Sequence, residues 1–273
     1  MKKITRRSFM AAAGLTVAAL ALTACGGSSS TASSAAASSE AASAAATELT
    51  TVEAGKLTMA TNAAFPPYEM TTDAGEFEGI DIETAQAIAD KLGLELQIDD
   101  MDFDAALLSV QQGKADIVMA GVTVTDERKA VMDFSDSYAT GIQSIIVPEG
   151  SDIASPDDLA GKMIGTQRGT TGYIYCSDDF GDETVVAYDD GLTAVQALNN
   201  GQVDAVVIDN APAKEFVAAN PGLVILDTSY AEEDYAIGMA KGSSLEDAVN
   251  AVLEELKADG TLQSIVDKYI TAE

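Results

Sequence analysis

Two stretches of the chain repeat one another without a gap. Residues 102–121, DFDAALLSVQQGKADIVMAG, align with residues 190–209, DGLTAVQALNNGQVDAVVID. Each copy has the spacing of an amphipathic helix, a glycine where the helix should end, a tight turn and a buried strand. Any two helix–turn–strand units share part of this pattern, but if the repeat is real, the chain contains two similar α/β lobes. The identical pairs are Asp102/Asp190, Ala106/Ala194, Gly113/Gly201, Asp116/Asp204 and Val118/Val206.

Strand-like and helix-like segments also alternate around the repeat. In the first half, strands are expected at 56–61, 94–99 and 115–121 and helices at 81–93 and 102–113. In the second half, strands are expected at 162–167, 185–190 and 204–209 and helices at 170–176 and 191–201. This alternation predicts parallel sheets covered by helices, which bind ligands at the carboxyl ends of their strands. Gly121 and Asp209 occupy equivalent places at two such ends, so we expect a ligand cleft between the lobes.

The last part of the chain is too short for a third lobe. The strand-like segment DYAIGMA is followed only by two helical stretches, so we expect this part to return to the first lobe. The chain would then cross between the lobes twice, near 138–142 and near 234–237, and paired crossings suit a hinge. We therefore expect lobe 1 to comprise residues 55–139 and 237–273, and lobe 2 to comprise residues 140–236.

The amino terminus has the composition of an export signal. Four basic residues precede an apolar run over 11–24, which is shorter than the roughly 20 residues that a membrane-spanning helix needs. The run closes on LTAC at Cys25, which resembles the lipobox of bacterial lipoproteins; a plain secretory signal is the alternative. The segment TRRSFM is also similar to a twin-arginine signal, which leaves the export route open.

The segment after the signal is predicted to be a tether. Residues 26–54 begin as almost pure Ser, Ala, Thr and Gly, and a segment with so little apolar bulk does not offset the entropy of ordering it. With the signal peptide, predicted over 1–25, cleaved before Cys25 and Cys25 lipidated as the new first residue, we expect the folded part outside the cytoplasm, anchored to the cell membrane.

Charge and residue usage exclude several classes of function. The chain has 44 acidic and 15 basic residues, and a surface this negative disfavours nucleic acid as a partner. It contains no histidine, which removes Ser-His-Asp and Cys-His nucleophile systems and the commonest zinc ligand, so we expect no metal or cofactor. An enzyme that uses carboxylates, Lys or Tyr stays possible. Cys176 is the one cysteine besides Cys25, and we interpret it as a small buried apolar residue.

The segment AGVTVTDERKAVMDFSDSY, residues 120–138, carries the most chemical information. Thr125 is placed to cap a helix, and Asp126 and Glu127 suit the positive end of that helix. A cation is unfavourable there. Arg128 therefore either pairs with neighbouring acids at the surface or points its guanidinium at an anion in the cleft.

Residues 121–138 are closely similar to the signature of family 3 bacterial extracellular solute-binding proteins, the polar amino-acid receptors of ABC importers. The similarity extends over about 56–270 and includes ATNAAFPPYEM, FEGIDIETA, GTQRGTTG and VVIDNAPA. It implies an α/β fold of the type II periplasmic-binding-protein class, with two βα lobes joined by two hinge strands. It also implies a monomer that closes on a free amino acid and delivers it to an ABC transporter permease.

The resemblance implies a role for each residue that matches the family motifs. Arg128 would hold the α-carboxylate of the ligand, helped by backbone N–H groups around Thr123 and Thr171. Asp209 would hold the α-ammonium, with the Thr123 hydroxyl and the Gly121 carbonyl as further acceptors. A helix N-cap is the alternative role for Asp209.

Other matched positions concern the rest of the ligand. Phe65 and Phe103 would pack on its aliphatic stem, although both could simply be core residues. Tyr68 and Glu69 lie in the same loop as Phe65, with roles that the resemblance leaves open.

Side-chain specificity follows less directly from the sequence. Receptors for basic amino acids in this family often have an acid where this chain has Asn62, so we expect a neutral polar ligand. Gln167, and as a second candidate Gln143, could meet a polar ligand side chain. Arg168 either attracts an acidic ligand or faces solvent, and the identity of the amino acid stays open.

Two other classes of function are compatible with this fold. Some relatives dehydrate cyclohexadienyl acids, but that chemistry needs a general acid or base with a tuned pKa, and no residue of the sequence stands out for it. We therefore expect a binding protein and not an enzyme. A sensor that signals through a partner protein in trans is the remaining alternative.

Overall fold

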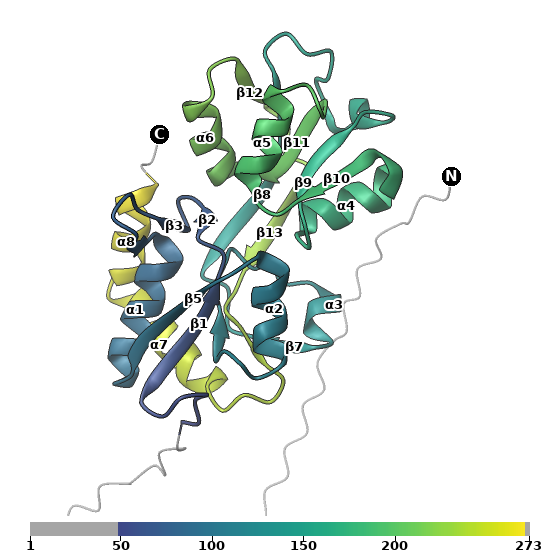
Figure 1. The fold of residues 1–273 in the computed structure, drawn as a ribbon. Coiled ribbons are helices and arrows are strands. Elements are labelled where there is room, and N and C mark those ends of the chain that lie inside the picture. The colour runs from purple at the N-terminus through teal and green to yellow at the C-terminus, as the bar shows by residue number, and fades with distance from the viewer. Residues whose placement is uncertain (1–48, 271–273) are drawn as a thin grey trace, which may run out of the picture. The chain divides into compact units, whose positions relative to one another are not determined.

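The computed structural model describes residues 49–270, which form two α/β lobes (Figure 1). The predicted signal peptide 1–25, the lipidation site Cys25 and most of the predicted tether lie outside the described residues. Residues 49–54, the end of the predicted tether range, contact the folded part: Leu49 packs on the core, and the Val52 N–H donates to Asp116 at 2.7 Å. No helix within 49–270 has the length and apolarity needed to cross a membrane.

The first lobe is built on a five-stranded sheet with the order β5-β1-β6-β14-β7. In its centre, β1 pairs in parallel with both β5 and β6, whereas β14 pairs antiparallel with β6 and β7. A small sheet of order β2-β3-β4 lies beside it. The strands are β1 (Lys56–Thr61), β2 (Ala64–Phe65), β3 (Glu69–Thr71), β4 (Phe77–Glu78), β5 (Glu95–Asp100), β6 (Ile117–Val118), β7 (Met132–Phe134) and β14 (Gly238–Ala240); the helices are α1 (Ile80–Leu92), α2 (Phe103–Gln111), α3 (Asp126–Lys129), α7 (Glu246–Ala258) and α8 (Thr261–Tyr269).

The second lobe is built on a sheet with the order β10-β9-β11-β8-β12, in which β13 also pairs with β8. Strand β9 pairs in parallel with β10 and β11, while β8 runs antiparallel to β11, β12 and β13. The strands are β8 (Ala139–Pro148), β9 (Ile164–Gln167), β10 (Val185–Tyr188), β11 (Ala205–Asp209), β12 (Leu223–Ile225) and β13 (Ala231–Tyr235); the helices are α4 (Thr171–Phe180), α5 (Gly191–Asn199) and α6 (Asn210–Ala219), with short 3₁₀ turns at Pro156–Leu159 and Asp182–Thr184.

The chain passes between the lobes in β8 and β13, which run side by side in Figure 1. The two strands pair antiparallel from Ala139↔Tyr235 to Gln143↔Ala231. This antiparallel pairing differs from the predicted parallel sheets, because a chain that leaves the first lobe and comes back must cross in opposite directions. The sheets are therefore mixed, and β6, expected to be long, has only Ile117 and Val118 in regular pairing.

The sequence repeat corresponds to a structural repeat. Gly113 and Gly201 have φ values of 66° and 67°, in the left-handed region that a residue without Cβ adopts easily. Each follows its helix and donates its N–H to a carbonyl three residues back, as the Schellman C-cap requires. Asp116 and Asp204 then accept from the N–H of Thr58 and Met163, respectively, at 2.8 Å. The same four-part unit is therefore present in both lobes.

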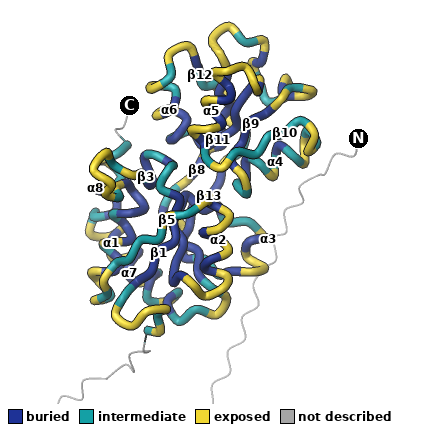
Figure 2. Tube along the Cα trace, in the orientation of Figure 1, coloured by how far each residue is buried: buried dark blue, intermediate teal, exposed yellow. Residues whose placement is uncertain are grey.

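Buried residues gather along the central strands of both lobes (Figure 2), and the two faces of each sheet contribute to separate core clusters. In the second lobe, one face of β11 contributes Val207 to a cluster with Cys176 of α4, and the other face contributes Ile208 to a cluster with Phe216 of α6. Cys176 is fully buried, as expected for a small apolar residue. In the first lobe, α1 and α7 cover one face, while α2 covers the other.

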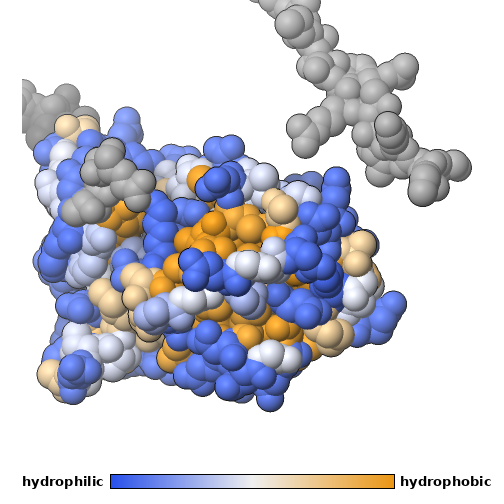
Figure 3. Space-filling model, turned by 90° about the horizontal axis from the view of Figure 1, so that it is seen from above, coloured by the Kyte–Doolittle hydropathy of each residue, from blue (hydrophilic) through white to orange (hydrophobic). Residues whose placement is uncertain are grey.

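The outer face of the second lobe, seen from above in Figure 3, has apolar side chains gathered near its centre and hydrophilic side chains around them. The exposed large apolar side chains of the described residues include Leu108, Ile174 and Leu192. Exposed apolar residues are ordinary on protein surfaces.

Candidate functional site

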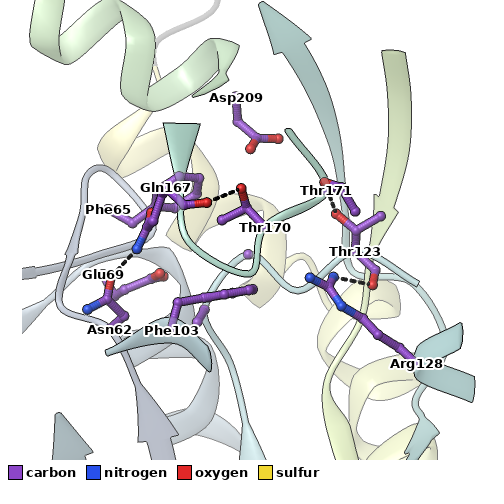
Figure 4. Close-up of a pocket in the computed structure, with 12 residues that line it drawn as sticks. Asn62, Phe65, Glu69, Phe103, Thr123, Arg128, Gln167, Thr170, Thr171 and Asp209 are labelled. Atoms are coloured by element: carbon purple, nitrogen blue, oxygen red, sulfur yellow. Dashed lines mark hydrogen bonds between the residues drawn. The ribbon is translucent and has the colours of Figure 1, made fainter. Parts of the chain in front are cut away.

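A cavity between the lobes is lined by side chains from both of them (Figure 4). All the residues predicted to bind a ligand lie on its wall: Asn62, Phe65, Phe103, Gly121, Thr123, Arg128, Gln167, Thr171 and Asp209. Three further lining residues, Glu69, Ala120 and Thr170, were not predicted as ligand contacts. The structure thus brings the predicted set together, and their roles toward a ligand are considered below.

Arg128 enters the cavity from the start of α3. The Thr125 hydroxyl caps this helix by accepting from the Arg128 N–H at 3.1 Å. Arg128 is only 8% exposed, so the alternative of a surface ion pair does not hold. It donates to the Thr123 carbonyl at 2.8 Å and, across the cleft, to the Gly169 carbonyl at 3.1 Å. It also lies over the Phe103 ring, 5.4 Å from the centroid. Burial lowers the pKa of Arg128.

Asp209 enters from the opposite lobe, at the carboxyl end of β11. Its carboxylate accepts from Gln143 Nε2 at 2.8 Å and from the Tyr235 hydroxyl. Although Asp209 is the residue before α6, its side chain makes no capping hydrogen bond, so the N-cap alternative is wrong. Burial, and then the charge of Glu233, raise the pKa of Asp209 to about 7.

Gly121 leaves room for the aromatic wall of the cavity. Its φ is +55°, and a Cβ added there would come within 2.9 Å of the Phe65 ring and 3.3 Å of the Tyr235 ring. Its N–H donates to Asp81 at 3.0 Å, and Asp81 also accepts from the Tyr138 hydroxyl at 2.7 Å. A side chain at 121 would therefore displace the ring of Phe65 toward the cavity.

Asn62 and Gln167 close the end of the cavity away from Arg128. Gln167 Nε2 donates to Asn62 Oδ1 at 2.8 Å across the lobes, and Asn62 Nδ2 donates to the Met101 carbonyl at 2.9 Å. Figure 4 shows Glu69 beside Asn62 at this end. Glu69 is fully buried, and no N–H or hydroxyl group of the described residues donates to its carboxyl oxygens, but its carboxyl group shares a hydrogen bond with that of Asp81. Burial and the neighbouring Asp81 raise the pKa of Glu69 well above its usual value.

Two residues weighed for ligand specificity lie elsewhere. Gln143 is on β8, behind the cavity wall, where its amide donates to Asp209 and, at 3.0 Å, to Glu233. Arg168 is about half exposed and pairs with Asp189 at 2.9 Å, so it faces solvent. Within residues 49–270, no group of three or more Cys, Asp or Glu side chains is arranged to hold a metal ion.

A model of the bacterial extracellular solute-binding proteins, family 3, matches residues 57–272. The chain is a family 3 solute-binding protein. It is 32% identical over 226 residues to the L-cystine-binding protein TcyJ of Escherichia coli. The alignment covers 81% of this chain and 85% of TcyJ. It is 33% identical over 230 residues to the arginine-binding extracellular protein ArtP of Bacillus subtilis, covering 80% and 87% of the two chains.

This family 3 protein also resembles solved structures. An ancestral arginine-binding protein bound to arginine superimposes with a TM-score of 0.75 at 42% identity, over 79% of this chain and 98% of that one. The predicted family and two-lobed fold are confirmed. The predicted class of function, an amino-acid receptor of an ABC importer, agrees with these relatives, which give no support to the dehydratase or the sensor.

Proposed function

We propose that this protein captures a free basic amino acid, of the arginine type, between its lobes and presents it to an ABC permease. The ligand backbone would be held from both sides. Arg128 belongs to the segment that follows β6 of the first lobe, and Asp209 ends β11 of the second. A zwitterion that bridges the two stabilises the closed form by contacts that an open form lacks.

Arg128 and the start of α4 suit the α-carboxylate. A guanidinium has five N–H donors, and the carbonyls of Thr123 and Gly169 take only some of them. The Thr171 N–H begins α4, where backbone donors are unpaired and the helix dipole favours an anion. A planar fork with added amide donors replaces much of the hydration that a buried carboxylate loses.

Asp209 and its neighbours suit the α-ammonium. An ammonium has three N–H donors and needs as many acceptors when it is buried. The Asp209 carboxylate, the Thr123 hydroxyl and the Gly121 carbonyl belong to residues that line the same cavity. They would supply this set.

Glu69 is the observation that favours a basic side chain over a neutral one. Its carboxyl group is buried in the cavity wall, where no N–H or hydroxyl group of the described residues donates to it and its side-chain partner is another acid, Asp81. A cationic ligand end would pair with it, lower its pKa and convert it to the carboxylate. Arginine-binding relatives are consistent with this choice. The sequence favoured a neutral ligand because Asn62 stands where receptors for basic amino acids often have an acid. We propose that Glu69 of β3 supplies that acid instead.

Calorimetric titration of the signal-free protein tests the proposal. L-arginine should bind tighter than L-citrulline, its neutral isostere, by about tenfold or more, the scale of a charge-assisted hydrogen bond. Glu69→Gln should remove most of this difference, while Glu78→Gln, an exposed residue of the same small sheet, should preserve it. Equal binding of arginine and citrulline would reject the basic ligand. Absence of binding to every amino acid would reject the receptor.

The remaining parts of the proposal concern location and catalysis. We expect a lipid on Cys25 to hold the mature protein, as a monomer, at the outer side of the cell membrane. Cys25→Ala should then release it from the membrane fraction. We expect no turnover when the protein is incubated with prephenate or arogenate, and product formation would support the alternative that the protein is a dehydratase.

A further inference from the structure

Glu233 is a buried acid that the proposed contacts with the ligand do not use. It lies on β13, where the alternation of the strand leaves Glu232 and Asp234 exposed and turns Glu233 and Tyr235 inward. Glu233 is 7% exposed, yet it is not among the residues that line the cavity. It lies directly behind two that are, Thr123 and Thr171.

Three donors from three different elements converge on one oxygen of Glu233. Its Oε2 accepts from the Thr123 hydroxyl of the first lobe at 3.2 Å and from the Thr171 hydroxyl of the second lobe at 3.0 Å. It also accepts from Gln143 Nε2 of β8 at 3.0 Å. The other oxygen, Oε1, is buried, and the carboxyl group also interacts with the Tyr175 hydroxyl. The carboxyl group thus joins the hinge to both walls of the cavity.

These contacts fix the direction of two hydroxyl groups. An ionised carboxylate only accepts hydrogen bonds, and a threonine hydroxyl has a single proton to donate. When Thr123 and Thr171 give their protons to Glu233, only lone pairs are left for the cavity. The two hydroxyl oxygens lie 3.5 Å apart, so they present neighbouring acceptors to whatever occupies the site.

Gln143 extends the same arrangement to Asp209. Its amide nitrogen donates to one oxygen of Asp209 and to Glu233, which leaves no donor of that amide for the cavity. The side chains on the hinge side of the site therefore offer acceptors only. A cationic group with several N–H donors suits it, whereas a hydroxyl supplies one donor and a carbonyl supplies none.

We propose that Glu233 is a positioning residue that makes the site select α-amino acids over their α-hydroxy and α-keto analogues, by turning the Thr123 and Thr171 hydroxyls into acceptors. The proposal rests on the proposed function, because it assumes that the ligand ammonium lies beside Asp209. Glu233 acts through the two threonines and has no contact with the ligand.

The test compares dissociation constants for L-arginine and its α-hydroxy analogue, 2-hydroxy-5-guanidinopentanoate. Glu233→Gln replaces the carboxylate by a neutral amide, so the threonine protons are freed to turn toward the ligand. The preference for the amino acid should fall by about tenfold or more, the scale for loss of a hydrogen bond to a charged group. Glu232→Gln makes the same charge change on the exposed face of β13 and should leave the preference unchanged.

Each outcome decides a different point. A preference that is unchanged in Glu233→Gln, even if both ligands bind more weakly, would overturn the positioning role, because a purely structural residue weakens both alike. An equal fall in Glu232→Gln would assign the effect to net charge and overturn it too. If Glu233→Gln does not fold, Glu233→Asp shortens the side chain and keeps its charge. Glu233→Asp should lower the preference for the amino acid, and an unchanged preference would contradict the positioning role. A wild-type protein that binds no amino acid would instead reject the proposed function.

Discussion

At the scale of the residue, Arg128 combines several unfavourable conditions. It stands in the first turn of a helix, where a cation is disfavoured, and burial lowers its pKa. Two carbonyl acceptors and the Phe103 ring compensate in part. We expect a cation in such a position to bind an anion, and the cavity that Arg128 lines is where that anion would bind.

Replacing Arg128 by Ala should weaken binding of the amino acid by about 2–5 kcal/mol, the range for removing one partner of a buried charge pair. Arg168→Ala is the matched control, because Arg168 is exposed and paired with Asp189. Titration calorimetry measures both. A loss of less than tenfold in Arg128→Ala would mean that the carboxylate binds elsewhere.

The pH dependence of binding should report Asp209. Burial raises the pKa of Asp209 from its usual 3.8 to about 7, so the free site is protonated below that pH, whereas the bound ammonium favours the carboxylate. Through Asp209, binding should therefore release a proton below pH 7, and the part of the affinity that depends on Asp209 should rise with pH and level off above about 7. Glu69, whose pKa is also raised, adds a further proton release when the ligand is a cation. Calorimetry in buffers of different ionisation enthalpy measures this proton.

The same shift has the opposite sign for folding of the unliganded protein. A raised acid pKa contributes stability that is fully present below the unfolded pKa and is lost as the pH rises through the folded pKa. Asp209→Asn should remove the contribution of Asp209 from both profiles. An affinity that stays constant from about pH 5 to 8, without proton release, would argue against Asp209 as the partner of the ammonium.

At the scale of the element, the structure explains what the sequence could and could not predict. Helices and central strands were predictable because glycines and aspartates mark their ends. Gly113 and Gly201 cap the carboxyl ends of their helices, and Asp116 and Asp204 accept hydrogen bonds at the start of the next strand. The two- and three-residue strands of the β2-β3-β4 sheet were not, since such short pairings leave no periodic pattern.

The candidate site was predictable where a family motif covers it and not where only tertiary contacts define it. Glu233 lies in the acidic run YAEEDY, which resembles a solvated surface segment. Its one local signal is the period of two that puts Glu233 and Tyr235 on the same face of β13. Glu69 belongs to the predicted loop, but its burial beside Asp81 without a conventional donor follows from packing that the sequence does not reveal.

The hinge strands should tolerate little added volume at Gly141. A Cβ there would come within 2.5 Å of the Tyr235 ring, and Tyr235 also donates to Asp209. Gly141→Ala should therefore destabilise the fold by about 1–3 kcal/mol, as overpacking does, and should weaken ligand binding. Thr140→Ala, the exposed neighbour on β8, is the control. Chemical denaturation measures the free energy of unfolding, and equal values for both variants would contradict the packing argument.

At the scale of the whole molecule, both lobes are needed to make one site. Contacts cross between them at Gln167 and Asn62 and at Arg128 and Gly169, and Glu233 on the hinge reaches a threonine of each lobe. A ligand held only by one lobe would not favour closure, because a population shifts only by differential affinity. In the proposed function, recognition of the two charged ends from opposite lobes would link occupancy to shape, which a permease can sense.

A crystal structure of the signal-free protein with L-arginine is the most direct measurement of this bridging. The α-carboxylate should lie within hydrogen-bond distance of the Arg128 guanidinium and the α-ammonium within that distance of Asp209, with the side chain toward Glu69. A ligand bound in the reverse orientation, or with both charged ends on one lobe, would contradict it.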